Sequence, residues 1–144
     1  MLEKVQVVIL KKDNESYDTL LLQTNQKRGS FWQNITGGVE LNDSSIHHAA
    51  QREIKEEIGL ELEIQKIISL NQHFEYYDQN RDITYKEHFF VAIIPSKANI
   101  TLSEEHINFK WVNTKFISLS NYKFESSFAA LALALKVLGQ DLTV

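Results

Sequence analysis

The chain has 144 residues, of which 43% are hydrophobic, and its net charge is −4. This length predicts a single globular domain over residues 1–144. The absence of cysteine excludes disulfides, thiolate metal sites and cysteine nucleophiles, and the acidic balance disfavours a broad nucleic-acid surface. The N-terminal apolar run is too short for a signal peptide or a membrane span, so we expect a cytoplasmic protein without a membrane partner.

The first quarter of the chain predicts two strands joined by a polar loop. Residues 4–10 alternate and then become a continuous apolar run, which is typical of a buried strand. Residues 11–17 are polar and predict a hairpin loop, and residues 19–23 predict the returning strand. Lys4 lies just before the buried run, where it is either a solvated strand end or a contact for a substrate phosphate.

A polar, basic loop at residues 25–30 leads toward a glycine pair. Its Lys27 and Arg28 are either ordinary loop residues or contacts for phosphate groups. Gly37 and Gly38 allow the backbone to turn sharply and to approach a ligand closely. This loop is therefore a candidate binding segment.

The next segment predicts an amphipathic helix. Asp43 or Ser44 can cap its first backbone amides, and Gly59 stands where a left-handed C-cap is commonest. An apolar stripe recurs every fourth residue, at Ile46, Ala50, Ile54 and Ile58. We expect this stripe to face the core.

Beside the apolar stripe runs an acidic one. Glu53, Glu56 and Glu57 fall at i, i+3 and i+4, a spacing that puts them on one helix face. Their mutual repulsion would be offset by a hard divalent cation such as Mg2+, which prefers oxygen ligands. The charge spacing alone also fits a solvated surface helix.

The glycine loop and the acidic helix together resemble the Nudix box, Gly-x5-Glu-x7-Arg-Glu-aliphatic-x-Glu-Glu-x-Gly-aliphatic. The positions that match are Gly38, Arg52-Glu53-Ile54, Glu56-Glu57 and Gly59-Leu60. The exception is the first glutamate, where the chain has Ser44. Counting from Gly37 would put Asp43 in that place, with one extra residue before Arg52.

Three further segments follow the box. Residues 61–70 predict a strand, and residues 87–94 predict a second one. Residues 71–86 are aromatic and polar without a clean period, so they indicate a loop or hairpin tip. This tip contains His73, Tyr76, Tyr77 and Arg81, which are candidates for stacking on a base and contacting phosphate, although a solvent-facing hairpin fits equally well.

The C-terminal part contains one more acidic candidate and a second helix. Glu105 and His106, followed by Lys110-Trp111-Val112, resemble the Nudix segment whose acidic residue binds metal or takes a proton from water. Glu105 is preferred over Glu104 for this role. Residues 120–140 predict a helix that is apolar on all sides, ends at Gly139 and packs on the sheet.

The Nudix resemblance implies an α/β fold, an α/β/α sandwich with a mixed β-sheet between helices, which agrees with the order of the predicted elements. It also implies Mg2+, with Mn2+ as a substitute, held by Glu53, Glu56, Glu57 and the backbone of Gly37. The catalytic residues it implies are Arg52, Glu53, Glu56 and Glu105. Arg52 would orient a glutamate, and Glu105 or Glu53 would accept a proton from water.

The run from Trp32 to Glu40 is similar, within this family, to bacterial dihydroneopterin triphosphate pyrophosphatases, which also act on dATP. The expected reaction therefore releases pyrophosphate and a monophosphate from a nucleoside triphosphate-like small molecule. The predicted substrate contacts are Lys4, Lys27, Arg28, Trp32, Thr36, Gly38, Tyr77 and Arg81. The alternatives are a dinucleoside polyphosphate hydrolase, an RNA 5′-pyrophosphohydrolase and a non-catalytic nucleotide sensor. Nucleic acid other than an RNA 5′ end is not expected as a partner, and both monomer and homodimer stay open.

Overall fold

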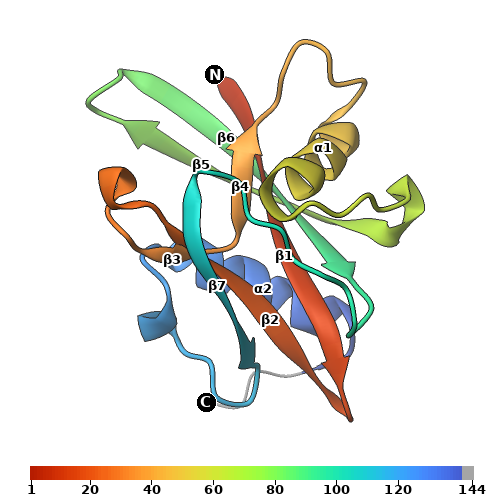
Figure 1. Cartoon of the computed structure of the whole chain (residues 1–144). Coiled ribbons are helices and arrows are strands. Elements are labelled where there is room, and N and C mark those ends of the chain that lie inside the picture. The colour runs from red at the N-terminus through yellow and green to blue at the C-terminus, as the bar shows by residue number, and fades with distance from the viewer. Residues whose placement is uncertain (141–144) are drawn as a thin grey trace.

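A mixed β-sheet of seven strands forms the centre of the computed structural model, which describes residues 1–140 (Figure 1). The strands are Leu2–Asp13 (β1), Ser16–Thr24 (β2), Trp32–Gln33 (β3), Ile35–Gly38 (β4), Ile67–Asp78 (β5), Ile83–Ile93 (β6) and His106–Asn113 (β7). Their order is β3-β2-β1-β6-β5, with β4 also pairing with β1 and β7 with β2. Strands β1 and β6 are parallel, and the other pairs are antiparallel.

Two helices cover opposite faces of this sheet. Helix α1 spans Ile46–Ile58 and helix α2 spans Glu125–Val137; Figure 1 shows α1 in front of the sheet and α2 behind it. Short 3-10 turns occupy Gln26–Arg28 (η1), Ile64–Lys66 (η2) and Leu119–Asn121 (η3). The predicted α/β/α sandwich is confirmed. Neither α-helix in residues 1–140 is long and apolar enough to cross a membrane.

Both faces of strand β1 are buried, because its side chains point alternately toward the two helices. Val5 and Val7 pack in one core cluster with Ile54 of α1, whereas Val8 packs in a second cluster with Leu131 of α2. A strand between two helical layers loses water on both sides, so it carries a continuous apolar run rather than a strict alternation. This sandwich fixes the positions of the loops at the ends of the strands.

The first hairpin is longer and its turn tighter than the sequence predicts. Strand β1 continues to Asp13 and β2 begins at Ser16, so the turn comprises only residues 14 and 15. Asn14 adopts a left-handed backbone with φ of 55°. The expected loop at residues 11–17 is wrong because its polar residues keep pairing beyond the core, as in the pair Lys12 and Tyr17.

The second hairpin also differs from the prediction. Residues 71–86 are mostly strand, because β5 runs to Asp78 and β6 begins at Ile83. The pairing register shifts between Ser69 and His73, and Asn71 there has φ of 55°. Such a bulge interrupts the period of two that identifies a strand in sequence. Residues 61–66, expected as strand, instead form a connection that includes η2.

Candidate active site

Helix α1 carries the acidic residues, and its ends are well defined. Its N-cap is Ser45, whose side chain accepts a hydrogen bond from the backbone N–H of His48 at 3.1 Å. The expected cap, Asp43 or Ser44, is therefore wrong by one or two residues. Gly59 ends the helix as predicted, with φ of 75° and its N–H donated to the carbonyl of Lys55.

Arg52 joins the helix to the loop that precedes it. Its Nε and Nη2 donate to the two carboxylate oxygens of Asp43, both at 2.9 Å. Its Nη1 donates to Glu53 at 2.9 Å and to Glu56 at 3.1 Å, and Nη2 also reaches the carbonyl of Gly38 at 2.7 Å. A guanidinium with this many partners holds both glutamates in fixed positions.

Asp43, rather than Ser44, supplies a carboxylate to Arg52. Its side chain is only 6% exposed and forms the two-pronged contact with Arg52. Hydrogen bonding from Arg52 lowers the pKa of Asp43, so the carboxylate stays charged. Ser44 is exposed. Of the two alternatives that the sequence leaves open, Asp43 is the residue that reaches the arginine.

Glu53 is packed against the glycine loop. The residue is buried, and burial raises its pKa to about 7, although the contact with Arg52 acts in the opposite direction. A Cβ added at Gly37 would lie 2.1 Å from the carboxyl carbon of Glu53. Position 37 therefore needs glycine for space, because any side chain would displace this carboxylate.

Glu57 lies at the other edge of the acidic face, where β7 begins. Its Oε2 is 2.7 Å from Nδ1 of the buried His106, a close contact that is not aligned as a regular hydrogen bond. Ser103 donates its hydroxyl to the same carboxylate at 3.0 Å. Burial acts to raise the pKa of Glu57, but His106 and Ser103 outweigh it and lower the pKa.

Glu105 adds a fourth carboxylate beside Glu57. Its pKa is raised by partial burial and then by the negative charge of Glu57. Two carboxylates in one site repel each other when both are charged, so Glu105 binds a proton more readily than an isolated glutamate, while Glu57 stays charged. The predicted Glu105 is thus brought to the acidic helix, although it comes from a distant part of the chain.

The acidic residues provide the oxygen donors that a hard divalent cation prefers, but their side chains are not arranged around one common point. Within residues 1–140, no three His, Asp or Glu side chains are arranged as a complete metal site. Arg52 engages two of the glutamates and His106 a third. Yet the donors are all oxygens, and a cation would relieve both the buried charge of Glu53 and the repulsion around Glu57.

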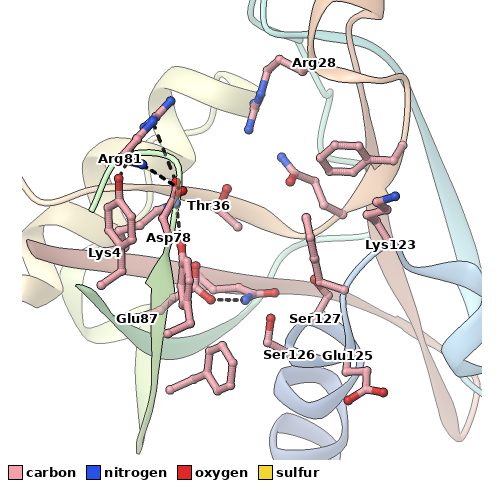
Figure 2. Close-up of a pocket in the computed structure, with 17 residues that line it drawn as sticks. Lys4, Arg28, Thr36, Asp78, Arg81, Glu87, Lys123, Glu125, Ser126 and Ser127 are labelled. Carbon is pink, nitrogen blue, oxygen red and sulfur yellow. Dashed lines mark hydrogen bonds and ion pairs between the residues drawn. The ribbon is translucent and has the colours of Figure 1, made fainter. Parts of the chain in front are cut away.

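A cavity of about 840 Å3 opens between the β5–β6 hairpin and the start of α2 (Figure 2). Four of the predicted substrate contacts line it: Lys4, Arg28, Thr36 and Arg81. Gln33 also lines the cavity, and its Nε2 lies 3.3 Å from Nε2 of His106. Because His106 contacts Glu57, a short chain of side chains connects the cavity with the acidic helix.

The other four predicted contacts, Lys27, Trp32, Gly38 and Tyr77, do not line this cavity. Strand alternation explains the two aromatic residues. Tyr77 points away from its neighbour Tyr76 and donates to Asp82 at 2.6 Å, whereas Tyr76 lines the cavity. Trp32 stacks under the ammonium of Lys110, 4.1 Å from the ring centre.

The sequence indicates Tyr76 as a stacking residue but not the rest of the aromatic wall, nor the polar floor of the cavity. Phe74, Tyr76 and Tyr85 form a stacked series with centroid separations of 5.6 and 5.2 Å. Two buried polar residues, Gln6 and Glu87, form the floor. A signal did exist, because Gln6 and Glu87 are polar residues inside runs that otherwise read as buried strand. Without the strand pairing, nothing indicated that both face one cavity.

Comparison with known proteins identifies similar sequences. The NUDIX domain family model matches residues 2–129. The dihydroneopterin triphosphate diphosphatase of Haemophilus influenzae is 31% identical over 123 residues, covering 78% of this chain and 75% of that protein. An octanoyltransferase of Myxococcus xanthus is 29% identical over 109 residues, which is 76% of this chain but 30% of that longer protein.

Solved structures share the fold along most of the chain. An Ap4A hydrolase of C. elegans superposes with a TM-score of 0.79 at 20% identity, covering 96% of this chain and 98% of that one. The dihydroneopterin triphosphate pyrophosphohydrolase of E. coli superposes with a TM-score of 0.74 at 24% identity, covering 90% and 91% of the two chains. At these identities the likeness establishes the fold alone.

Proposed function

This chain belongs to the NUDIX domain family, and from that premise we propose that it is a Mg2+-dependent hydrolase of a nucleoside triphosphate-like substrate. The first candidate is dihydroneopterin triphosphate, the substrate named for the H. influenzae relative. The products would be pyrophosphate and a monophosphate. The observation that carries the proposal is the contact chain from Gln33 through His106 to Glu57, which joins a ring-sized cavity to the acidic helix.

The cavity suits a flat heterocycle with an attached phosphate chain. Tyr76 and Tyr85 provide an aromatic wall, and such walls bind planar rings by stacking. Arg28, Arg81 and Lys123 bring positive charge to the lining. Guanidinium groups bind phosphate oxygens with two parallel hydrogen bonds, so these side chains would steer and hold the phosphates.

The acidic residues support hydrolysis at the phosphate end. Glu53, Glu56 and Glu57, with the carbonyl of Gly37, would hold Mg2+, which when bound neutralises phosphate charge and acidifies a water molecule. Arg52 positions Glu53 and Glu56 through its hydrogen bonds. Glu105, whose pKa is raised by burial and by Glu57, would accept the proton of the attacking water. Glu53 is the second candidate for this role.

A product-resolved assay tests the proposal. The purified protein is incubated with Mg2+ and separately with dihydroneopterin triphosphate, each dNTP, diadenosine tetraphosphate and triphosphorylated RNA. We expect pyrophosphate and the monophosphate from dihydroneopterin triphosphate at the highest rate. Faster cleavage of the dinucleotide or of the RNA would assign one of those activities instead. No turnover of any compound, with binding retained, would make this chain a non-catalytic nucleotide module.

Glu57→Gln is the matched variant for the assay. It keeps the shape of the side chain but removes the charge held between His106 and Ser103. We expect turnover to fall by at least ~10²-fold, the scale of losing metal-assisted stabilisation of transition-state charge. The control is Glu61→Gln, an exposed carboxylate paired with Lys55 outside the acidic face. Near-normal turnover of Glu57→Gln would remove Glu57 from the site.

A further inference from the structure

Three carboxylates line the cavity, and one of them differs from the others in its burial. Asp78 is half-buried and Glu125 is exposed, whereas Glu87 is only 4% exposed. Figure 2 shows Lys4, Arg81 and Glu87 toward one side of the view and Lys123 on the other. Burying a carboxylate costs free energy unless it has partners, so its position calls for a ligand or a structural explanation.

The protein supplies Glu87 with one hydrogen bond. Gln6 donates its Nε2 to Glu87 Oε1 at 2.8 Å. Among residues 1–140, no donor reaches the second oxygen, Oε2. The nearest cation on the neighbouring strand is Lys4, whose ammonium donates to the hydroxyl of Tyr76 instead. Because the residue lines the cavity, Oε2 is available to a bound molecule.

The direction of this hydrogen bond is fixed by the residues behind it. The carbonyl oxygen of the Gln6 side chain accepts from Asn34 Nδ2 at 2.8 Å, and the same Asn34 nitrogen also donates to the carbonyl of Ser127 at 3.1 Å. Gln6 must therefore turn its NH2 group toward Glu87. In its charged form Glu87 consequently presents only an acceptor at the floor of the cavity, and a ligand atom that meets it must then be a donor.

From this geometry we propose that Glu87 selects the heterocycle, favouring a ring with two adjacent N–H donors over adenine. The inference rests on the proposed function, because it concerns the ring of the same substrate. Guanine and pterins share a 2-amino-4-oxopyrimidine edge, in which a ring N–H stands next to an amino group. Adenine instead presents a ring nitrogen acceptor beside its amino group. When the adenine amino group donates to Oε2, that ring acceptor would face Oε1 and repel it, whereas the ring N–H of guanine or a pterin can donate to Oε1 beside the hydrogen bond from Gln6.

Selection by a buried acceptor is strong in principle. A site built to form a hydrogen bond discriminates against a ligand that lacks the donor, because the buried group is then left unpaired. The aromatic wall of Tyr76 and Tyr85 does not discriminate in this way, since every base has a face to stack. Glu87 therefore determines which ring is bound, while the wall determines only that a ring is bound.

Binding measured without Mg2+ tests the proposal separately from hydrolysis. Isothermal titration in EDTA compares dGMP, dIMP, dAMP and neopterin, none of which contains an anhydride bond. We expect dGMP and neopterin to bind at least ~10-fold more tightly than dAMP, with dIMP between them because it lacks the 2-amino group. Equal affinities for dGMP and dAMP in the wild-type protein would overturn the proposal without requiring any variant.

Glu87→Gln then tests the residue itself. Because Gln6 still donates toward position 87, the new amide would turn its oxygen to Gln6 and its NH2 to the cavity. We expect the ratio of dAMP to dGMP dissociation constants to fall by at least ~10-fold. Glu125→Gln, which removes an exposed carboxylate at the same cavity, should leave the ratio unchanged. An unchanged ratio in Glu87→Gln would overturn the assignment.

The outcomes distinguish this inference from the proposed function. Turnover of triphosphates without any preference in the titrations would refute the role of Glu87 and leave the hydrolase intact. A preference that depends on Glu87, without turnover of any triphosphate, would refute the hydrolase and leave the ring selection intact. Binding of none of the four compounds would overturn the assignment of the cavity as the ring site.

Discussion

Arg52 contacts Glu53, Glu56 and the glycine loop, and it forms a two-pronged contact with Asp43. Arg52 donates one hydrogen bond to each carboxylate oxygen of Asp43, both at 2.9 Å, and the Asp43 side chain is 6% exposed. We predict that Asp43→Asn lowers the free energy of unfolding by about 1.5–3 kcal/mol, as expected for hydrogen bonds to a charged group. Turnover should fall ~10- to 100-fold because Arg52 no longer holds Glu53 and Glu56 in place.

Ser44→Ala is the control for this prediction, since the two residues are adjacent in the same loop. Ser44 is exposed, so we expect a change within about 0.5 kcal/mol and unaltered turnover. Urea denaturation and steady-state kinetics measure both quantities. If Ser44→Ala proves the more damaging of the two, the loop does not use Asp43 as the missing acidic residue.

Glu87 gives a second prediction at this scale, on the pH dependence of stability. Burial raises its pKa above the ordinary 4.5, with Lys4 and Gln6 acting in the opposite direction. Above pH 4.5 the folded state thus binds the proton more tightly than the unfolded state, so stability falls as pH rises through the raised pKa. Glu87→Gln does not titrate, and its free energy of unfolding relative to wild type should increase with pH.

Urea denaturation at several pH values from 5 to 8 measures this difference. Glu15→Gln, an exposed carboxylate in the turn between β1 and β2, provides the baseline for removing one negative charge. A difference between Glu87→Gln and wild type that stays constant over this range would show that Glu87 has the same pKa in the folded and unfolded states.

At the scale of elements, the alternation of strand β5 assigns opposite roles to two neighbouring tyrosines. Tyr76 lines the cavity and stacks on Tyr85 at 5.2 Å, whereas Tyr77 is 54% exposed and bonded to Asp82. We predict that Tyr76→Ala weakens substrate binding ~5- to 150-fold, since stacking of an aromatic side chain on a base contributes about 1–3 kcal/mol. Tyr77→Ala should change binding less than twofold. The Michaelis constants of the two variants measure this difference. A larger increase in the Michaelis constant for Tyr77→Ala than for Tyr76→Ala would contradict the strand orientation.

The elements also show what a sequence pattern can predict. Helix α1 was predicted because its apolar stripe and Gly59 follow from local geometry, and the Arg-Glu motif within it is likewise local. The N-cap was missed because Ser44 and Ser45 are chemically alike. Only the beginning of strand β5 falls in a predicted strand, and its continuation to Asp78 was missed because the bulge near Asn71 breaks the period of two. The cavity floor could not be predicted, because Gln6 and Glu87 meet only through the parallel pairing of β1 with β6. This pairing sets Gln6 opposite Phe89, about 80 residues further along the chain.

At the scale of the whole molecule, the sheet brings two distant sets of residues to one region. The acidic face comes from α1 and the segment before β7, whereas the cavity comes from β1, the β5–β6 hairpin and the start of α2. Strand β4 lies between them, because its Thr36 lines the cavity and its Gly37 contacts Glu53. A substrate with a ring at one end and phosphates at the other matches this arrangement.

The whole molecule should therefore gain stability when a divalent cation binds. Its net charge is −4, and Glu53 is buried beside two further glutamates of α1. A ligand at ~100 times its dissociation constant adds about 2.7 kcal/mol to the free energy of unfolding, because it binds the folded state only. We predict that saturating Mg2+ raises the Tm by several degrees and that EDTA reverses the rise.

NaCl at matched ionic strength separates binding from general screening, and it should raise the Tm by much less. The variant Glu53→Gln tests the location, because it removes the buried carboxylate while keeping its shape. Its Tm without metal should equal or exceed that of wild type, since burial penalises the charged form of Glu53. Its response to Mg2+ should be largely lost. An equal response in both proteins would place cation binding elsewhere, because a ligand stabilises the folded state only through the residues that it contacts there.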